Sequence, residues 1–416
     1  MPGRMSAQTR ILLRLLLLGL TLLTWPRLLE KILPLDWRIG DMRPFAYGVQ
    51  IVFGCLTIIV FRAGRRVDSL SSKIFPTRKK LAFAFVAVSL SLILSLIAAE
   101  VMCRFLGLPF ERTKPWIPSE NALARFDPEV GWSYIPNRTV VQKFGSEQRN
   151  VAIHFNEIGS RVRAPGIRHD PNAPTVFFVG DSYTMGHGLP YEDGFVGKVE
   201  SMKEFPFQVV NLGVEGYGSD QALLLLKRHF KKFNTKAVVY TYIDEHIARN
   251  ANYDRRTMYR NIRILGTKPL FALRRDGTLY LEKKPVRYDH LRYSRLWASF
   301  QIVWTRWGPK PNVELTRALV QEMKSYVESN GAKFIVVHWY QRDYRKWNPP
   351  PTLGPGESPF RGMNLNLIDT TVNPPPDWKD WLIDQHPDAR AHAHVARLIA
   401  EELQRILGNQ DDHGRR

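Results

Sequence analysis

The chain has 416 residues, 44% of them hydrophobic, and carries 59 lysines and arginines against 39 acidic residues, a formal net charge of +20. This length accommodates a hydrophobic region and one domain of about 250 to 280 residues. Its two cysteines, Cys55 and Cys103, lie within or at the edge of hydrophobic runs. The rest of the chain therefore has no disulfide framework and no cysteine-based metal site.

Three hydrophobic segments precede the more polar part of the chain. Residues 81–101 are uncharged over nearly their whole length and approach the roughly 20 apolar residues that cross a bilayer, and 45–61 form a second uncharged run. The shorter run 11–25 has a signal peptide as its alternative, but no small-x-small cleavage site follows it, which favours a retained span. The pattern predicts two or three transmembrane helices within residues 1–103.

The loop between the second and third segments, residues 62–80, predicts the orientation. It holds seven lysines and arginines and a single acid, Asp68, and such loops stay in the cytoplasm. The chain after Met102 would then lie on the periplasmic or extracellular side of the cytoplasmic (inner) membrane. Nucleic acid is not an expected partner on that side.

Positive charge is concentrated between Leu225 and Phe300, where there are eighteen lysines and arginines and six acids. On the outer side of a membrane, such a surplus favours anionic membrane lipid or an acidic glycan as the partner. An ordinary charged surface without a specific partner explains it equally well.

An apolar run of strand type at 175–179 ends in Gly180-Asp181-Ser182. The serine is thereby placed at the carboxyl end of a strand, which is where open parallel sheets bind ligands. A helix that starts there would direct backbone N–H groups at a reacting oxygen. Ser182 is therefore the candidate nucleophile, and the alternative is an ordinary strand-to-helix turn with an Asp/Ser cap.

Two later segments supply complementary chemistry. The apolar residues 209–212 open into a glycine-rich turn, where Gly216 could bring a backbone N–H against a developing oxyanion because no Cβ blocks the approach. Asp384-Gln-His386-Pro387 stands directly before a long helix. A serine near an Asp/His pair supplies a nucleophile, a base and an orienting acid.

These segments together resemble the SGNH (GDSL-type) esterase family. The residues that carry the resemblance are Gly180-Asp181-Ser182, Asn211 to Gly216, Asp384 and His386. The stretch 155–161 is similar to the lead-in of membrane-anchored, envelope-associated members, and the resemblance spans roughly residues 131–407. It implies an α/β fold, a three-layer α/β/α doubly wound parallel sheet, and acyl-ester chemistry without cofactor or metal.

The resemblance also implies the roles of the site residues. Ser182 would attack the ester, His386 would act as base, and Asp384 would orient the histidine. The N–H groups of Ser182 and Gly216 would hold the oxyanion. Supporting positions are Asp181 and Asn211.

Two positions depart from the family pattern. Where the third block usually presents an Asn, as Gly-x-Asn-Asp, the chain has Asp244-Glu245-His246. An ionised Asp accepts hydrogen bonds and would repel an oxyanion, so His246, or more remotely Asn250, is the replacement donor. Asp384 lies two residues before the histidine where the family has three, which leaves Asp380 in reserve. Losing one oxyanion donor typically lowers turnover by about 10²–10³, so an altered or inactive enzyme stays open.

In chain order, we predict a connector from Met102 to about Val130 and short strands at 131–137 and 151–155. The predicted core strands are 175–179, 207–212, 237–242, 332–339 and 364–369, and the predicted helices are 193–204, 219–232, 312–329 and 388–407. As domains, the predicted pattern is 1–103 membrane region, 104–150 connector and short strands, 151–408 SGNH-like domain, and 409–416 polar tail.

Three further features carry expectations. An aromatic helix containing Trp297, Trp304 and Trp307 is expected to pack on the sheet or lie on the membrane, with packing favoured. The proline-rich segment 340–380 is expected to wall one side of the active cleft. His386, His392 and His394 lack the spacing of a zinc site, and the last two are expected on the exposed and half-exposed faces of the final helix.

The favoured function is an extracytoplasmic serine esterase acting on acyl, above all acetyl, esters of envelope glycans. One alternative is an O-acyltransferase to glycan, which would need a membrane partner protein as acyl donor because three spans are too few to carry acyl groups across. The other is a catalytically inactive, glycan-binding envelope-assembly protein. A separation of Ser182 and His386 beyond hydrogen-bond reach would favour the binding protein.

Overall fold

The computed structural model describes residues 78–106, 123–144, 149–203, 205–254, 266–287, 294–297, 299, 313–339, 358–372, 377–378, 382–383 and 386–408. The chain divides into two compact units. The first consists of residues 1–114 and 288–305, and the second of residues 115–287 and 306–416.

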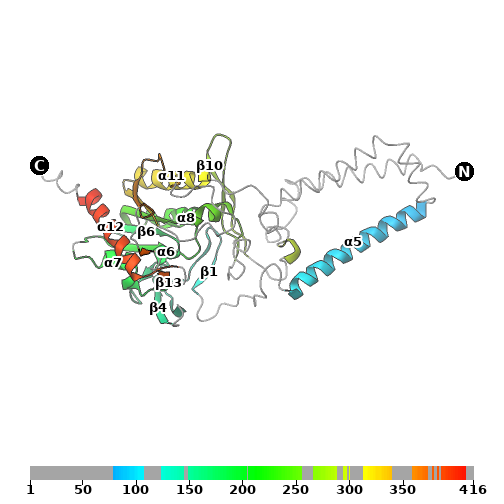
Figure 1. Ribbon diagram of the computed structural model, residues 1–416, viewed down its shortest axis with the longest axis horizontal. Coiled ribbons are helices and arrows are strands. Elements are labelled where there is room, and N and C mark those ends of the chain that lie inside the picture. Colours follow the sequence, from blue (N-terminus) through cyan, green and yellow to red (C-terminus); the bar gives the residue numbers. More distant parts are fainter. Residues whose placement is uncertain are drawn as a thin grey trace. The chain divides into compact units, whose positions relative to one another are not determined.

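The described part of the first unit is dominated by helix α5, Arg78–Leu106 (Figure 1). This helix contains the segment expected to form the third span. Within the described ranges, no helix combines the length and the apolar character that crossing a membrane requires. The prediction of a helix is thus confirmed, whereas the prediction that it spans is not supported. The other two expected spans, 11–25 and 45–61, lie outside the described residues.

Glu100 of α5 binds the start of a second helical segment. Its carboxylate accepts hydrogen bonds from Ser294 Oγ at 3.0 Å and from the N–H groups of Arg295 and Leu296 at 3.0 and 2.9 Å. The two N–H groups are unpaired backbone donors of a helix start, which a carboxylate satisfies well. Residues 288–305 belong to the same unit as α5, and the packing of the Trp297 segment on the sheet stays a prediction. Trp304 and Trp307 lie outside the described residues.

The second unit is built on an eight-stranded sheet of order β12-β11-β8-β6-β7-β5-β4-β3. Its parallel part consists of β6 (Pro174–Gly180), β7 (Gln208–Gly213), β8 (Asn234–Tyr242), β11 (Lys333–His338) and β12 (Asn366–Asp369). An antiparallel extension follows, made of β5 (Arg161–Val162), β4 (Arg149–Phe155) and β3 (Thr139–Phe144). All five predicted core strands are confirmed as the parallel part.

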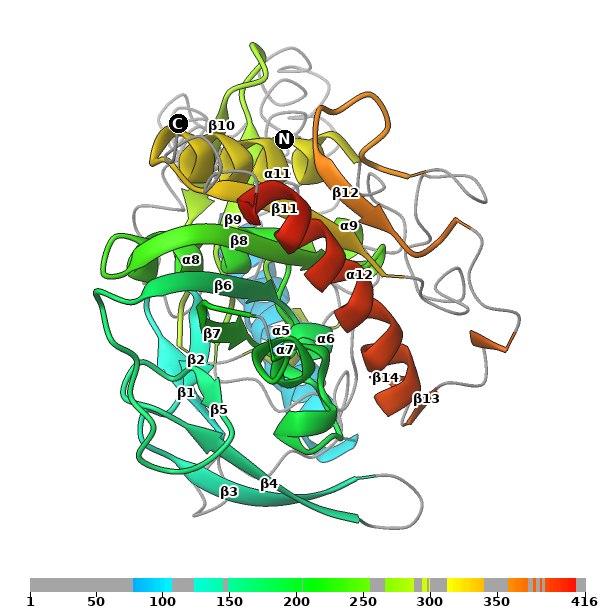
Figure 2. The same cartoon turned by 90° about the vertical axis from the view of Figure 1, so that its left-hand side faces the viewer.

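Helices cover both faces of this sheet (Figure 2). On one face lie α8 (Ser219–Phe230) and α11 (Val313–Ser329), and on the other lie α7 (Phe195–Glu200) and α12 (Ala389–Leu407). Successive strand side chains point to opposite faces, so β6 contributes to two cores. The predicted three-layer α/β/α arrangement is confirmed, as are the four predicted helices.

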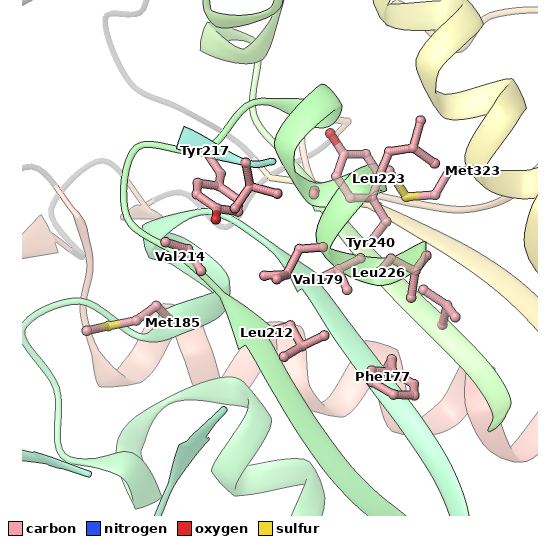
Figure 3. Close-up of a cluster of buried hydrophobic side chains, with 14 of the residues drawn as sticks. Phe177, Val179, Met185, Leu212, Val214, Tyr217, Leu223, Leu226, Tyr240 and Met323 are labelled. Carbon is pink, nitrogen blue, oxygen red and sulfur yellow. The ribbon is translucent and has the colours of Figure 1, made fainter. Parts of the chain in front are cut away.

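The core on the α8 and α11 side is shown in Figure 3. Phe177 and Val179 of β6 and Tyr240 of β8 pack there against Leu226 of α8 and Met323 of α11, all of them almost completely buried. Burying one such apolar side chain is worth about 1.5–3 kcal/mol. The opposite core is equally dry, and its members include Val176, Phe178, Val395 and Ile399. With both faces packed, the sheet is a rigid support for the loops at the carboxyl ends of its strands.

Several short elements complete the second unit. They are β1 (Ala124–Asp127) with β2 (Gly131–Tyr134), β9 (Leu270–Leu273) with β10 (Leu279–Lys283), β13 (Leu382–Ile383) with β14 (His386–Pro387), α6 (Ser182–Met185), α9 (Glu245–Ala251) and the 3₁₀ turn Tyr191–Asp193. The predicted connector between Met102 and Val130 is thus wrong at both ends, because α5 extends to Leu106 and β1 begins at Ala124.

Part of the predicted basic region is internal. Lys268 forms a buried ion pair with Asp220, and Arg249 is buried against Asp181 and Glu245. Charges held this way are neutralised within the fold and do not contribute to a basic surface. The excess of positive charge on the outside is accordingly smaller than the count of residues indicates.

Candidate active site

The turn after β6 holds Ser182 at the carboxyl edge of the sheet. Asp181 caps α6, because its Oδ1 accepts a hydrogen bond from the Tyr183 N–H at 2.9 Å. Ser182 is the first residue of that helix, so its N–H belongs to the orphan donors of a helix start. Gly180 pairs with Gly213 in parallel register, which brings the turn after β7 beside the serine turn.

Gly213 is required by this close approach. A Cβ built on Gly213 would lie 2.3 Å from the Met185 backbone nitrogen and 2.6 Å from Thr184 carbon atoms. Non-bonded atoms do not approach that closely, so a side chain at this position would displace the backbone of Thr184 and Met185. The glycine therefore sets how tightly β7 packs under the serine helix.

Ser182 and His386 meet at the centre of the site. His386 Nε2 lies 2.9 Å from Ser182 Oγ, within hydrogen-bond reach, although the two residues are 204 positions apart in the chain. Ser182 is 4% exposed and His386 is half-buried at the start of β14. The structure thus brings the predicted nucleophile and the predicted base together. Asp384 and its reserve Asp380 lie outside the described residues, so the orienting acid stays a prediction.

Asn211 connects the two turns, as the supporting role predicted for it requires. Its side-chain amide donates to the Thr184 carbonyl at 3.1 Å, and its Oδ1 accepts from the Gly213 N–H at 3.0 Å. The side chain is buried, so both bonds are made away from water and fix the turn geometry.

Gly216 adopts a left-handed backbone, with φ of 75°. A Cβ there would meet only the Trp132 ring at an ordinary 3.6 Å. The surrounding protein would thus admit a Cβ, and it is the left-handed backbone conformation that favours glycine here. Its role as an oxyanion donor stays a prediction.

Asp181 is the centre of a buried ionic network beneath the serine. Its Oδ2 accepts from Arg249 Nη1 at 2.8 Å and from His246 Nε2 at 3.2 Å. Burial alone would raise the pKa of Asp181, but the hydrogen bond and charge of His246 and the charge of Arg249 hold it at about 2. The carboxylate is therefore ionised at neutral pH and supports the turn that presents Ser182.

His246 is not available as the replacement oxyanion donor. Both its ring nitrogens are engaged, Nε2 with Asp181 and Nδ1 with the Tyr240 hydroxyl at 2.9 Å, and the side chain is completely buried. Asn250 is likewise committed, since its amide donates to Ser219 Oγ and Thr316 Oγ1. The prediction of His246 in the oxyanion site is wrong because the third block folds inward to bind Asp181.

Asp244, at the altered position of the third block, is bound by His338 at the end of β11. His338 Nε2 lies 2.9 Å from Asp244 Oδ1, and its Nδ1 lies 3.5 Å from Asp369 Oδ1. Burial lowers the pKa of His338, but hydrogen bonds and charges of the two carboxylates outweigh it and raise this pKa to about 9. The imidazolium therefore pairs with the carboxylate that stands where the family pattern has its amide donor.

Sequence reasoning overlooked His187 and Glu215. The His187 ring stacks on that of His386, with centroids 4.1 Å apart, and its Nδ1 lies 2.5 Å from Glu215 Oε1. Glu215 stands in the glycine-rich turn after residues 209–212, and His187 stands in Gly186-His187-Gly188, a few residues after the Ser182 motif. A polar side chain between glycines at the carboxyl end of a strand was the available signal.

The last helix holds a further correction. His392, expected on an exposed face, is buried, and its Nδ1 accepts a hydrogen bond from the Phe195 N–H at 3.0 Å. Burial lowers its pKa to about 3, so it is neutral. His394 is half-exposed, as predicted, and its ring packs edge-on against Trp378. Among the described residues, no group of three or more histidine, cysteine or acidic side chains could hold a metal ion.

The fold and the site together define an α/β protein with a serine–histidine pair at the carboxyl edge of a parallel sheet. Comparison with protein-family models finds no match, and comparison with curated proteins finds none either. Two solved structures are similar over 56% of this chain and 98% of their own: proteins assigned to the lipolytic G-D-S-L family from Desulfitobacterium hafniense, 14% identical, and from Veillonella parvula, 12% identical, each with a TM-score of 0.28. A likeness of that size carries no argument about this chain.

Proposed function

We propose that the protein is a serine esterase that hydrolyses acyl esters through Ser182 and His386. The observation that carries the proposal is the 2.9 Å contact between His386 Nε2 and Ser182 Oγ. That geometry is what a general base needs in order to take the hydroxyl proton of a nucleophile. It also speaks against the inactive binding protein, for which a separated pair was the expected sign.

In the proposed first step, Ser182 Oγ attacks the ester carbonyl carbon while its proton passes to His386 Nε2. The negative charge that develops on the carbonyl oxygen is stabilised by the Ser182 N–H, with Gly216 proposed as a second donor. Collapse of the tetrahedral intermediate breaks the ester bond, and the departing alcohol takes the proton from His386. Asp384 is proposed to orient the imidazole throughout.

The second step releases the acyl group. Water gives up a proton to His386 and attacks the acyl carbon. The bond to Ser182 Oγ then breaks while His386 returns the proton to Oγ, which regenerates both side chains and yields the carboxylic acid. A sugar hydroxyl in place of water would make the protein an O-acyltransferase with the same intermediate. Hydrolysis is proposed because transfer would need a separate membrane protein to supply the acyl donor.

The proposed substrates are acetyl esters of envelope glycans, outside the cytoplasm. The basic loop 62–80, with seven lysines and arginines, supports a cytoplasmic position for that loop and thus an outward position for Ser182. The apolar side chains exposed on α5 support contact with membrane lipid; they include Ile93, Leu94, Leu96, Ile97, Val101 and Phe105.

Labelling of the full-length protein with a fluorophosphonate tests the proposal, because the reagent reacts with activated serines. We expect labelling of the wild type and its loss in Ser182→Ala and His386→Ala. The matched control is Ser201→Ala, which removes an exposed serine just after α7 and should label like the wild type. A folded wild type that takes up no label would make the glycan-binding function the better account.

A further inference from the structure

A second carboxylate–imidazole pair lies against the catalytic histidine. The rings of His187 and His386 stack at 4.1 Å between centroids, with an interplanar angle of 29°. Glu215 Oε1 lies 2.5 Å from His187 Nδ1. Because His386 also reaches Ser182 Oγ, only the His386 ring separates the His187–Glu215 pair from the proposed nucleophile. The reaction proposed above makes no use of it.

The loop that carries His187 is held in place by Arg161. Arg161, which is buried, donates to the Gly186 carbonyl at 2.8 Å and to the Leu189 carbonyl at 2.6 Å, so it holds the chain on both sides of the histidine. Phe144 packs against the His187 ring edge-on, at 4.7 Å between centroids. Exposed ion pairs usually contribute little to stability and are not held in one geometry. The contacts of Arg161 and Phe144, in contrast, hold His187 in a defined position.

Glu215 is fixed just as firmly. Its N–H donates to the Tyr134 hydroxyl at 3.1 Å, and its carbonyl accepts from Trp132 Nε1 at 3.0 Å. Burial raises the pKa of Glu215, but the hydrogen bond and charge of His187 hold it below its ordinary value. At neutral pH the side chain is therefore a carboxylate with a fixed direction.

The pair keeps two hydrogen-bonding atoms open to the outside. The Glu215 carboxylate occupies His187 Nδ1, so Nε2 is the ring nitrogen left for a ligand, and Glu215 keeps its second oxygen, Oε2, as an acceptor. Within the described residues, neither His187 Nε2 nor Glu215 Oε2 has a hydrogen-bond partner, and neither is among the buried polar atoms. The two side chains are 21% and 33% exposed. A hydroxyl group, which both donates and accepts a hydrogen bond, fits this pair of atoms.

We infer that His187 and Glu215 form a subsite that binds a hydroxyl group on the alcohol part of the ester, so that the protein prefers esters of sugars and other polyols to esters of alcohols without further hydroxyls. This inference rests on the proposed function. A hydroxyl that hydrogen-bonds to His187 Nε2 or Glu215 Oε2 would orient the ester beside Ser182. An ester without that hydroxyl leaves these polar atoms desolvated and unpaired, which is the basis of strong discrimination.

Two esters and two variants of the full-length protein test the subsite. Methyl 6-O-acetyl-glucoside has hydroxyls on its alcohol part, and p-nitrophenyl acetate has none. His187→Phe keeps a ring to stack on His386 but removes both nitrogens, and Glu215→Gln keeps the shape but removes the charge. The control is His394→Phe, a half-exposed histidine of α12.

We expect His187→Phe to lower kcat/KM for the glucoside by roughly 10- to 100-fold, the value of a charge-assisted hydrogen bond. The rate with p-nitrophenyl acetate should change by less than about threefold, and Glu215→Gln should show a smaller loss of the same selectivity. The control should match the wild type with both esters.

Fluorophosphonate labelling separates the two possible failures. A wild type without label defeats the proposed function, and the subsite with it. A labelled wild type that does not hydrolyse the glucoside, or whose selectivity His187→Phe leaves unchanged, overturns the subsite alone. An equal loss with both esters also overturns it, because His187 would then act only through His386 or the fold.

Discussion

The guanidinium of Arg161 lies beneath the serine turn and donates at 2.6 Å to the carbonyl of Met185, the last residue of the short helix α6 whose first residue is Ser182. Burial lowers the pKa of Arg161 to about 10, so the side chain is charged at neutral pH. With the bonds to Gly186 and Leu189, one buried cation thus fixes the whole loop that follows the nucleophile.

Replacing this cation should destabilise the fold. Arg161→Met leaves three carbonyls without their buried donor, and we expect the free energy of unfolding to fall by about 3 kcal/mol or more. Urea denaturation measures the change. Arg168→Met, at an exposed arginine seven residues later, should stay within about 0.5 kcal/mol of the wild type. Equal effects of the two variants would contradict the role given to Arg161.

Gly213→Ala should displace the serine turn. The new Cβ would stand 2.3 Å from the Met185 nitrogen, so either the turn moves or the protein unfolds. We expect fluorophosphonate labelling to fall at least tenfold, as it does when a reacting group is misplaced by about 1 Å. Gly408→Ala, where a Cβ meets nothing within 4 Å, is the control. Normal labelling of Gly213→Ala would show that the close approach is not needed.

His338 should make stability depend on pH on the alkaline side. Its folded pKa, about 9, lies above the ordinary 6.5. The stabilisation is therefore complete below pH 6.5 and is lost as the pH rises through 9. Urea midpoints between pH 6 and 10 should show the advantage of the wild type over His338→Gln shrinking as the pH rises. A constant difference over that range would contradict the ion pairs with Asp244 and Asp369.

His392 should act on the acid side. Its pKa falls to about 3 in the folded protein because it is buried, while the unfolded chain binds a proton near pH 6.5. Stability is therefore unaffected above pH 6.5 and falls as the pH drops towards 3. Replacing the neutral ring with Phe should weaken this acid sensitivity, which thermal unfolding at pH 7 and pH 4.5 measures. An identical loss between these pH values in wild type and His392→Phe would refute it.

The parallel sheet could be predicted because its strands are short runs of valine and phenylalanine bounded by glycine, as in Val176 to Gly180. Short continuous apolar runs of this kind are typical of strands buried on both faces in a parallel sheet. The β9–β10 hairpin was missed, although Asp276-Gly277 is a recognised hairpin signal and Gly277 has φ of 83°.

Part of the candidate site could likewise be predicted from the sequence and part could not. Ser182 and His386 stood in recognisable motifs, but the partners of His246 depend on which side chains the fold brings beneath β6. No spacing along the chain shows that His246 meets Asp181, 65 residues away. His392 could have been placed correctly, because it shares a helical period with Val395, Ala396 and Ile399, all of them buried.

The most direct measurement of the central claim is mass spectrometry of the full-length protein quenched in acid during turnover of p-nitrophenyl acetate. We predict one acetyl group on the peptide that contains Ser182, absent from Ser182→Ala. His386→Ala should acquire it at least about a hundredfold more slowly, because the base raises the rate by roughly 10²–10⁴. Hydrolysis without acetylation of Ser182, or acetylation at equal rate without His386, would contradict the account.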